Sequence, residues 1–400
     1  MFKSYDGLEL KKSETEGRYI IATRDIDVGE NLLKCKAYFS MPCEIYKKIT
    51  CGNCVKIIKR PQQEKKKKVK EYKCNVCNEI WYCSEFCKKE SQPIHAHYEC
   101  KFFKKIKAPK LSEWEIDPDT FTEVRMMVGV ISRFYQERVL NKKFNLSNYL
   151  KEQQEKRLLN QEELSSEDTL DDIFDLVENT IDDGSNKAAK ELIDIITDYI
   201  ANLFNLVITS SDNHDLPTPE LKKEAVEKVI SVIRELIHKV RCNQFGIWTK
   251  NDKCIAVAIS PSSSFFNHSC IPNCINIRDG NKMTFKALYP VKKGEPLAIS
   301  YLDLDLPVES RKEYLKYGYY FDCGCPRCDE KTNQDECMDN WISKFYCQRK
   351  KCVGLYYSKT KVNIDQVNKN DKITLNCSDC NNEFIINSTY FNNSPFPLTK

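Results

Sequence analysis

Cysteine and histidine side chains crowd one short stretch of this 400-residue sequence. Residues 51–100 hold seven cysteines and two histidines, and six of these cysteines form three close pairs. The pairs and the residues that follow them are Cys51-x2-Cys54, Cys74-x2-Cys77, Cys83-x3-Cys87, His95, His97 and Cys100. Two thiolates on one turn can bind the same zinc ion at ~2.3 Å. Eight such ligands predict two tetrahedral zinc sites.

Two further cysteine groups lie in the last quarter of the chain. Cys323-x1-Cys325-x2-Cys328 offers three ligands. Because a closed structural zinc site needs four, we expect Cys270 to donate the fourth and so tie a distant loop to this segment. Cys347-x4-Cys352 and Cys377-x2-Cys380 have the spacing of a zinc ribbon with two knuckles. The sequence therefore predicts three zinc sites. The ribbon offers a fourth, and the alternative is that its cysteines are plain thiols of a small terminal domain.

Composition favours metal over disulfides for these cysteines. The N-terminus, MFKSYDGLEL, has none of the features of a secretory signal, which predicts an address in the nucleus or cytoplasm, where thiols stay reduced. No apolar run reaches the ~18 residues of a membrane span, so we expect no membrane contact. The net charge of +4 is distributed unevenly along the chain. Residues 55–73 contain nine basic and two acidic residues, whereas residues 151–183 contain three basic and twelve acidic residues.

Short β-branched and aromatic runs frame the cysteine-rich stretch. RYIIATRDID and ENLLKCKAYF predict two or three strands in the first fifty residues, and CIAVAIS, CINIR, MTFKAL and PLAISY predict more from residue 254 onward. Residues 111–240 between them are predicted to be helical, since apolar residues from Leu192 to Phe204 recur at helical spacing and a second helix runs near Leu221–Val240. The sequence predicts an α+β fold in which distant segments complete one β structure.

Four stretches together resemble the SET domain. They are EGRYIIATRDIDVGE (16–30), SSSFFNHSCIPNC (262–274), VKKGEPLAISYLD (291–303) and YGYYFDCGCPRC (317–328). The cysteine-rich stretch, with YCS at 82–84, resembles the MYND zinc finger. Over about 17–100 and 241–328, the chain thus resembles the SET and MYND domain family of protein lysine methyltransferases, in a short form without the C-terminal helical-repeat domain.

The resemblance implies a SET-domain β fold interrupted by a MYND finger and by a helical insertion, followed by a post-SET zinc site and a C-terminal zinc-ribbon-like segment. The expected boundaries are 1–50 for the N-terminal part of the SET domain, 51–100 for the MYND finger, 101–240 for the helical insertion, 241–303 for the C-terminal SET core, 304–329 for the post-SET segment and 330–400 for the ribbon.

The same resemblance implies that the two zinc sites of the finger interleave. One zinc takes Cys51, Cys54, Cys83 and Cys87, and the other takes Cys74, Cys77, one histidine and Cys100. His95 keeps the family's spacing from Cys87, whereas His97 keeps an i, i+3 relation to Cys100. We favour His95 and leave His97 open.

The implied activity is transfer of a methyl group from S-adenosylmethionine to a lysine of a protein, histone or non-histone. A lysine with a pKa of ~10.4 is almost wholly charged at pH 7, so presenting its neutral amine costs ~4–5 kcal/mol. The cation of the cofactor and a narrow aromatic channel both disfavour lysine protonation. By resemblance, Tyr301 is the catalytic tyrosine at the transfer point, where its hydroxyl orients the amine and the methyl group.

The resemblance also assigns residues to the cofactor. Asn267 and His268 hold its adenine and amino-acid ends, and Gly17 and Arg18 cradle its methionine part. Tyr19 stands where the family pattern has a second glycine, which predicts a narrower pocket. Three further residues complete the cofactor side and close the lysine channel: Asn243, Tyr319 and Phe321.

A second functional class uses the same segments without catalysis. In this alternative, the chain is a catalytically weak or inactive SET–MYND scaffold that binds peptides or nucleic acid through its finger. The lysine-rich loop between Cys54 and Cys74 can attract nucleic-acid phosphates without sequence specificity. The acidic stretch can attract a basic substrate. We expect a monomer whose main partner is a protein with a target lysine.

Overall fold

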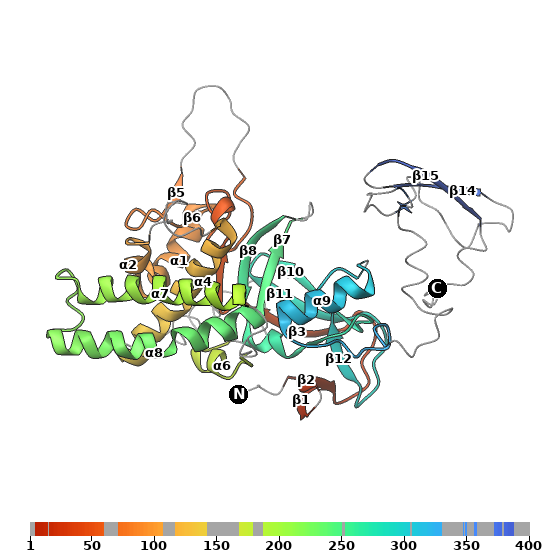
Figure 1. Ribbon diagram of the computed structural model, residues 1–400, viewed down its shortest axis with the longest axis horizontal. Coiled ribbons are helices and arrows are strands. Elements are labelled where there is room, and N and C mark those ends of the chain that lie inside the picture. Colours follow the sequence, from red (N-terminus) through yellow and green to blue (C-terminus); the bar gives the residue numbers. More distant parts are fainter. Residues whose placement is uncertain are drawn as a thin grey trace, which may run out of the picture. The chain divides into compact units, whose positions relative to one another are not determined.

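The protein is described by a computed structural model (Figure 1). The described residues are 5–14, 16–59, 71–106, 117–141, 168–178, 187–249, 253–304, 306–329, 347, 349, 356–357, 372–377 and 380–387. The chain divides into two compact units: the first holds Met1–Asn267 and Asn273–Ala298, and the second holds His268–Pro272 and Ile299–Lys400. Each unit is described here by itself.

Three small sheets combine strands from both ends of the SET-like sequence. The first has the order β1-β2-β12-β9 (Leu8–Ser13, Gly17–Ala22, Pro296–Ile299, Asn267–His268), the second β10-β11-β3 (Cys274–Asp279, Lys282–Ala287, Asn31–Lys36), and the third β4-β8-β7 (Phe39–Pro42, Cys254–Ile259, Gln244–Trp248). The pairs β2–β12, β3–β11 and β4–β8 are antiparallel and each joins an N-terminal strand to one from beyond residue 250. This confirms the predicted α+β fold completed by distant segments.

The prediction of two or three strands in the first fifty residues was too low. The structure has four, because β1 and β4 flank the two expected strands. β1 has the polar sequence LELKKS, and it is a strand because its residues from Leu8 to Ser13 pair in register with β2. Its alternation of apolar and charged residues covers only Leu8 to Lys11, which is too short a pattern to identify this edge strand from the sequence.

The helical insertion packs around one apolar core. Its helices are α4 (Pro118–Phe134), the π-helical turn η2 (Tyr135–Val139), α6 (Leu170–Phe174), α7 (Lys187–Thr209) and α8 (Pro219–Asn243). α7 and α8 run side by side (Figure 1). By length and composition alone, Lys190–Thr209 of α7 could cross a membrane, but its apolar face, from Ile193 to Ile208, is buried among α8, α4 and the finger.

The finger is a compact module inserted between strand β4 and helix α4. It consists of β5 (Tyr72–Lys73), β6 (Trp81–Tyr82), α1 (Glu85–His97) and α2 (Cys100–Phe103). Phe102 of α2 is fully buried and stacks on Phe204 of α7, with ring centroids 4.2 Å apart. On another side, the hairpin turn between β10 and β11 meets the first cysteine pair: a Cβ on Gly280, whose φ is +65°, would stand 2.0 Å from the carbonyl oxygen of Cys54. The finger therefore shares its core with the insertion and packs closely against a SET hairpin.

The second unit contains a helix and a small sheet. Helix α9 spans Val308–Tyr319 and ends at Tyr320, which has a left-handed backbone with φ +61°. The sheet has the order β13-β14-β15 (Tyr356–Tyr357, Lys372–Cys377, Glu383–Asn387), and its strands are antiparallel. Its described core is small, since it consists of Ile373, Leu375, Ile386 and two cysteines.

Candidate functional site

The structure brings together the cysteines that the sequence pairs in the finger. The sulfur atoms of Cys51, Cys54, Cys83 and Cys87 all lie within 4.8 Å of one another. The sulfurs of Cys54 and Cys83, which are 29 residues apart, are separated by 3.8 Å. Four thiols at one point form a donor set that fits a tetrahedral zinc ion.

A second finger group contains His95 and not His97. Its ligand atoms belong to Cys74, Cys77, His95 and Cys100 and also lie within 4.8 Å of one another. The Nε2 atom of His95 is 3.3 Å from the sulfur of Cys77, and its Nδ1 atom is 3.1 Å from a carboxylate oxygen of Glu99. A zinc-binding histidine commonly donates its other ring N–H to a carboxylate in this way, which fixes the tautomer and the ring orientation. Sequence reasoning missed Glu99, although its i, i+4 spacing from His95 was a signal.

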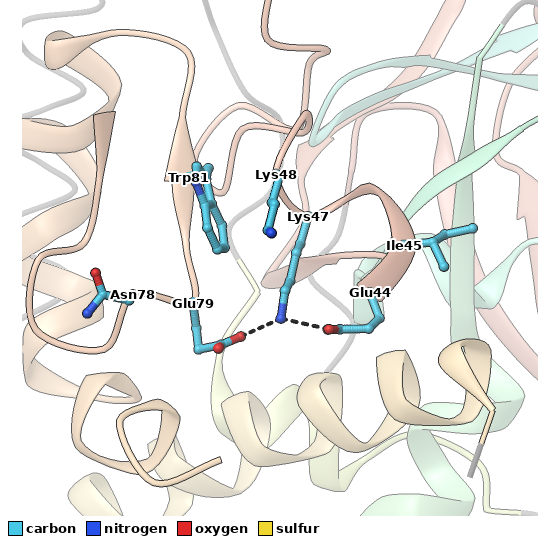
Figure 2. Close-up of a pocket in the computed structure, with 7 residues that line it drawn as sticks. All are labelled: Glu44, Ile45, Lys47, Lys48, Asn78, Glu79 and Trp81. Carbon is cyan, nitrogen blue, oxygen red and sulfur yellow. Dashed lines mark hydrogen bonds and ion pairs between the residues drawn. The ribbon is translucent and has the colours of Figure 1, made fainter. Parts of the chain in front are cut away.

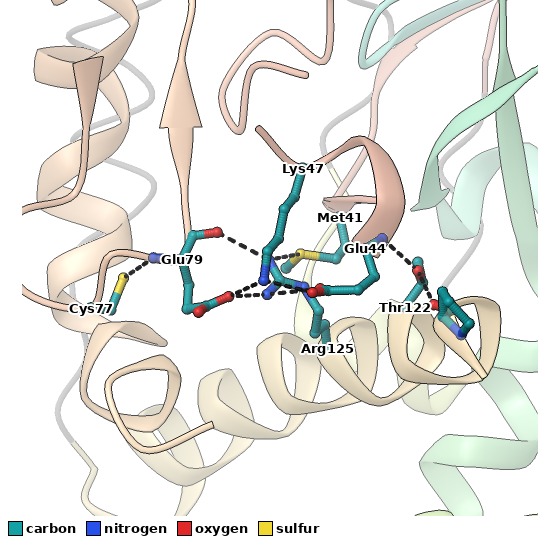
Figure 3. A network of polar contacts seen from close by, with 8 residues as sticks. Met41, Glu44, Lys47, Cys77, Glu79, Thr122 and Arg125 are labelled. Carbon is teal, nitrogen blue, oxygen red and sulfur yellow. Dashed lines mark hydrogen bonds and ion pairs between the residues drawn. The ribbon is translucent and has the colours of Figure 1, made fainter. Parts of the chain in front are cut away.

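Charged side chains join the finger to the 3-10 turn η1 (Glu44–Tyr46) and to helix α4. Lys47 lies between two carboxylates, with its Nζ atom 2.7 Å from Glu44 and 2.7 Å from Glu79 (Figure 2). Arg125 of α4 is fully buried and donates to the carboxylate of Glu79 at 2.5 Å and to its backbone carbonyl at 3.1 Å (Figure 3). The backbone N–H of Glu79 is in turn 3.5 Å from the sulfur of Cys77. The buried guanidinium of Arg125 thus contacts Glu79, and Glu79 in turn contacts the proposed zinc ligand Cys77.

A cavity of about 600 Å³ opens at this junction (Figure 2). It is lined by Glu44, Ile45, Lys47, Lys48, Asn78, Glu79 and Trp81. None of these lining residues is among those predicted to bind the cofactor. The lysine-rich loop predicted to contact nucleic acid falls largely on residues 60–70, outside the described residues.

In the second unit, the third cysteine group is complete. The sulfurs of Cys270, Cys323, Cys325 and Cys328 lie within 4.8 Å of one another, so the structure brings the predicted donor Cys270 to the post-SET cysteines. Arg311 of α9 is fully buried beside them, with its Nε atom 3.3 Å from the sulfur of Cys270. Four thiolates and one Zn²⁺ carry a net charge of −2, so this guanidinium compensates part of a buried negative charge. Sequence reasoning missed Arg311, since nothing in its local pattern marks it.

Four predicted residues of the second unit form one aromatic cluster. The Tyr301 ring lies 4.8 Å from Tyr319 and 6.5 Å from Phe321, and it is perpendicular to Phe321. The His268 ring is 5.4 Å from Tyr301, and its Nδ1 atom accepts the backbone N–H of Tyr301 at 3.0 Å. Burial raises the pKa of the Tyr301 phenol above its ordinary value, and burial lowers the pKa of His268 to about 4. Both side chains are therefore neutral at pH 7.

The remaining predicted cofactor residues lie in the first unit. Asn267 donates from Nδ2 to the backbone carbonyl of Glu16 at 3.0 Å, which holds the start of β2. There, Gly17 is exposed with φ +65°, and no described atom lies within 4 Å of the place where a Cβ would stand. The guanidinium of Arg18 lies 4.9 Å above the Phe265 ring, and burial lowers its pKa. The contacts of Asn267 and Arg18 thus hold the backbone around Gly17, and no described atom fills the space beside that glycine.

Two other predicted cofactor residues have structural contacts. Tyr19 lies half-buried in β2 opposite Lys11 of β1. Asn243 is the last residue of α8, and its Nδ2 atom donates to the carbonyls of Val177 at 3.0 Å and Lys239 at 2.7 Å.

A carboxylate from the insertion holds the turn that leads to Asn267. Asp168 accepts hydrogen bonds from the hydroxyls of Ser260 at 2.8 Å and Ser262 at 3.1 Å, and from the backbone N–H of Ser262 at 3.0 Å. The short helix η3 (Pro261–Phe265) begins there and Asn267 follows it. Sequence reasoning missed Asp168, because 92 residues separate it from Ser260.

Comparisons with known proteins identify the family of the chain. The SET domain family model matches residues 17–302. A SET and MYND domain-containing protein of Dictyostelium discoideum is 55% identical over 395 residues, which span 98% of this chain and 100% of that protein. A second one from the same organism is 49% identical over 99% of this chain and 100% of its own length.

More distant proteins are also similar. The chicken (Gallus gallus) protein named N-lysine methyltransferase SMYD2 is 25% identical over 82% of this chain and 62% of its own length. The solved structure of Rubisco LSMT bound to AdoMet covers 80% of this chain and 52% of its own at 12% identity and a TM-score of 0.32, a similarity too low for any argument. On the family match and the two Dictyostelium relatives, this chain belongs to the SET domain family and, within it, to the SET and MYND domain-containing proteins.

Proposed function

We propose that this protein is an S-adenosylmethionine-dependent methyltransferase that acts on a lysine of a protein substrate. The observation that carries the proposal is the aromatic cluster of Tyr301, Tyr319 and Phe321 at the end of a SET strand. Membership of the SET domain family supports methyl transfer, and the lysine specificity named for the chicken relative supports the choice of amino acid.

The aromatic cluster suits a lysine side chain in two ways. Ring faces around an aliphatic stem exclude water, which disfavours the charged ammonium and lowers the ~4–5 kcal/mol cost of presenting a neutral amine at pH 7. The rings also align the amine with an electrophilic carbon, and such alignment lowers the activation barrier by several kcal/mol. S-adenosylmethionine, when bound, supplies that carbon as the methyl group of a sulfonium.

The Tyr301 hydroxyl acts as a positioning and hydrogen-bonding group in this proposal, and not as the base. Because burial raises its pKa, it stays protonated over the working pH range and can both donate and accept. The neutral imidazole of His268 holds the backbone of Tyr301 through the 3.0 Å hydrogen bond. The proton of the lysine leaves to water before transfer.

The first unit offers a fitting place for the cofactor. Gly17 leaves open space where a side chain would otherwise stand, so a ligand can approach its backbone closely. Arg18 and Asn267 are held on either side of that backbone by Phe265 and Glu16. Backbone and amide groups of this kind suit the polar ends of S-adenosylmethionine.

Titration of S-adenosylmethionine into the zinc-replete protein tests the proposal, followed by mass spectrometry of proteins incubated with enzyme and cofactor. We expect saturable binding that Asn267→Ala weakens and Tyr301→Phe retains, and methyl groups on lysine that form with the wild type and much more slowly with Tyr301→Phe. A folded, zinc-loaded protein that binds no cofactor would instead be the scaffold of the alternative hypothesis. Binding with methylation of a residue other than lysine would retain the methyltransferase and reject the lysine.

A further inference from the structure

Two exposed tyrosines lie on helix α9, next to the aromatic cluster around Tyr301. Tyr314 and Tyr317 are 53% and 54% exposed. They are three residues apart, so both project from the same side of the helix. Neither is among the described side chains that pack against the core of the second unit around Leu315 and the post-SET cysteines. Packing against that core therefore does not account for these two large rings.

Tyr314 continues the aromatic cluster outward. The ring centroids of Tyr301 and Tyr319 are 4.8 Å apart, and those of Tyr319 and Tyr314 are 6.2 Å apart. Tyr301 and Tyr319 are half-buried whereas Tyr314 is mostly exposed, so the three rings lead from the proposed transfer point to the surface. The two steps together are no longer than about three residues of extended chain, which spans ~3.3–3.6 Å per residue. A peptide whose lysine reaches Tyr301 therefore brings its next few residues to Tyr314.

Gly318 leaves space beside the Tyr314 ring. It lies inside α9 and its φ is not positive, so the backbone does not require a glycine there, although glycine destabilises a helix. Beyond its two chain neighbours, the side-chain atoms nearest to the place of a Cβ are two ring carbons of Tyr314, at 3.9 and 4.0 Å. Because residues four apart are neighbours on a helix, a larger side chain at position 318 would cover that ring. The glycine thus keeps this side of the ring accessible.

The segment that carries these rings is acidic. Residues 301–322 hold five acidic and three basic residues, and one of the basic residues, Arg311, is fully buried beside the post-SET cysteines. Glu309 and Glu313 are exposed and lie one turn apart on α9. Aromatic ring faces and carboxylates both attract cations. The surface therefore suits the side chain of an arginine or a lysine and disfavours an acidic one.

We propose that Tyr314 and Tyr317 bind a basic side chain of the substrate that lies within about four residues of the target lysine. The cation packs on the ring faces, and the carboxylate of Glu313 compensates its charge. This inference rests on the proposed lysine methyltransferase function and adds the substrate class, which is a protein segment with a second basic residue close to the lysine.

Methyl transfer to a series of peptides tests the inference. Each peptide has one central lysine in a background of alanine and serine, and an arginine is placed at each neighbouring position in turn. Parallel sets carry leucine or glutamate in place of arginine. With the zinc-replete full chain and S-adenosylmethionine, we expect kcat/KM to be about 5–30-fold higher when arginine stands at one or two positions within about four residues of the lysine.

Variants of α9 identify the residues that cause this preference. Tyr314→Ala and Tyr317→Ala should each remove most of it, with the loss in KM and not in kcat, whereas Tyr314→Phe keeps a ring face and should retain it. Gly318→Leu covers the ring, so it should also lose the preference, although leucine favours the helix and should not lower the melting temperature. Tyr289→Ala removes a 40% exposed tyrosine from the first unit and is the control that should behave like the wild type.

Binding of the same peptides, labelled with a fluorophore, distinguishes this inference from the proposed function. Binding that depends on arginine and on both tyrosines, without any methyl transfer, would reject the methyltransferase and retain the docking surface. Methyl transfer that is insensitive to arginine, a preference that both alanine variants retain, or a preference for leucine or glutamate would each overturn the inference.

Discussion

Removing the Asp168 carboxylate should destabilise the protein and weaken cofactor binding together. Asp168→Ala leaves three donors without their acceptor: the hydroxyls of Ser260 and Ser262 and the backbone N–H of Ser262. Ser260 can turn its hydroxyl to Ser263, whose oxygen is 3.0 Å away. Ser262 loses two hydrogen bonds at once, one from its hydroxyl and one from its backbone N–H, and it is only 5% exposed.

The magnitude follows from those two donors. A hydrogen bond to a carboxylate contributes about 1.5–3 kcal/mol, so the loss of both costs about 3–6 kcal/mol. Part of this is offset, because burial raises the pKa of Asp168 and the wild type therefore buries a carboxylate at some cost. We expect a net loss of about 2–3 kcal/mol in the free energy of unfolding, or roughly 3–5 °C in the melting temperature.

The same substitution loosens the path to the cofactor residues. Helix η3 leads from Ser262 to Phe265, which lies under Arg18, and then to Asn267. A loss of ~1.4 kcal/mol in positioning these groups raises the dissociation constant of S-adenosylmethionine about tenfold. Thermal unfolding and calorimetric titration measure the two effects separately.

Two further variants make the experiment decisive. Asp168→Asn keeps an acceptor oxygen for Ser262 and should recover most of the stability and affinity. Asp171→Ala removes an exposed carboxylate from helix α6, which begins just after Asp168. Its surface ion pair with Arg138 contributes ~0–1 kcal/mol, so this variant should behave like the wild type. If Asp168→Ala melts and binds cofactor as Asp171→Ala does, the reasoning is wrong.

The pH dependence has a defined sign. Because the pKa of Asp168 is raised in the folded protein, folding favours its protonated form. This contribution is fully present below the unfolded pKa of ~3.9 and is lost as pH rises through the raised folded value. Asp168→Asn cannot ionise, so that part of the slope of stability against pH should disappear in acid titrations followed by circular dichroism.

Three other substitutions give separate tests. Glu99→Gln removes the carboxylate that orients the proposed zinc ligand His95. Chelator competition should therefore give a roughly 10–100-fold lower zinc affinity at that site, whereas His97→Ala should leave the affinity unchanged. Gly280→Ala places a Cβ 2.0 Å from the carbonyl oxygen of Cys54, at φ +65°. Gly294→Ala is the control, because its φ of +90° is also strained but no described atom lies within 4 Å of its Cβ. In denaturant titrations, Gly280→Ala should lower the free energy of unfolding by at least ~1 kcal/mol more than Gly294→Ala does. Tyr301→Phe should slow methyl transfer by ~10²-fold or more with unchanged cofactor affinity. Its residual rate should rise between about pH 7 and 10 as the wild-type rate does. The reason is that burial raises the pKa of the Tyr301 phenol, so the phenol does not ionise in this range and does not cause the rise. A wild-type zinc affinity in Glu99→Gln, equal stability of the two glycine variants, or a flat pH profile in Tyr301→Phe would each contradict its prediction.

The sequence by itself determined the features that lie within one turn of chain. The spacing of Cys74-x2-Cys77 and of the post-SET cysteines identifies donor pairs, because two residues on one turn must lie near the same point whatever the rest of the fold does. The helical periodicity around Leu192–Phe204 predicted α7 for the same local reason. Strand β1 escaped detection because its pairing with β2, and not its own composition, makes it a strand.

Only the tertiary structure decided which distant groups meet. His95 and His97 differ by half a turn of one helix, and the direction in which α1 packs brings His95 to Cys77. Asp168 reaches Ser262 across 94 residues, and Arg311 reaches Cys270 across 41. These contacts depend on the path of the whole backbone, which no short pattern encodes. The ligands could therefore be predicted from the sequence, whereas the groups that orient and neutralise them could not.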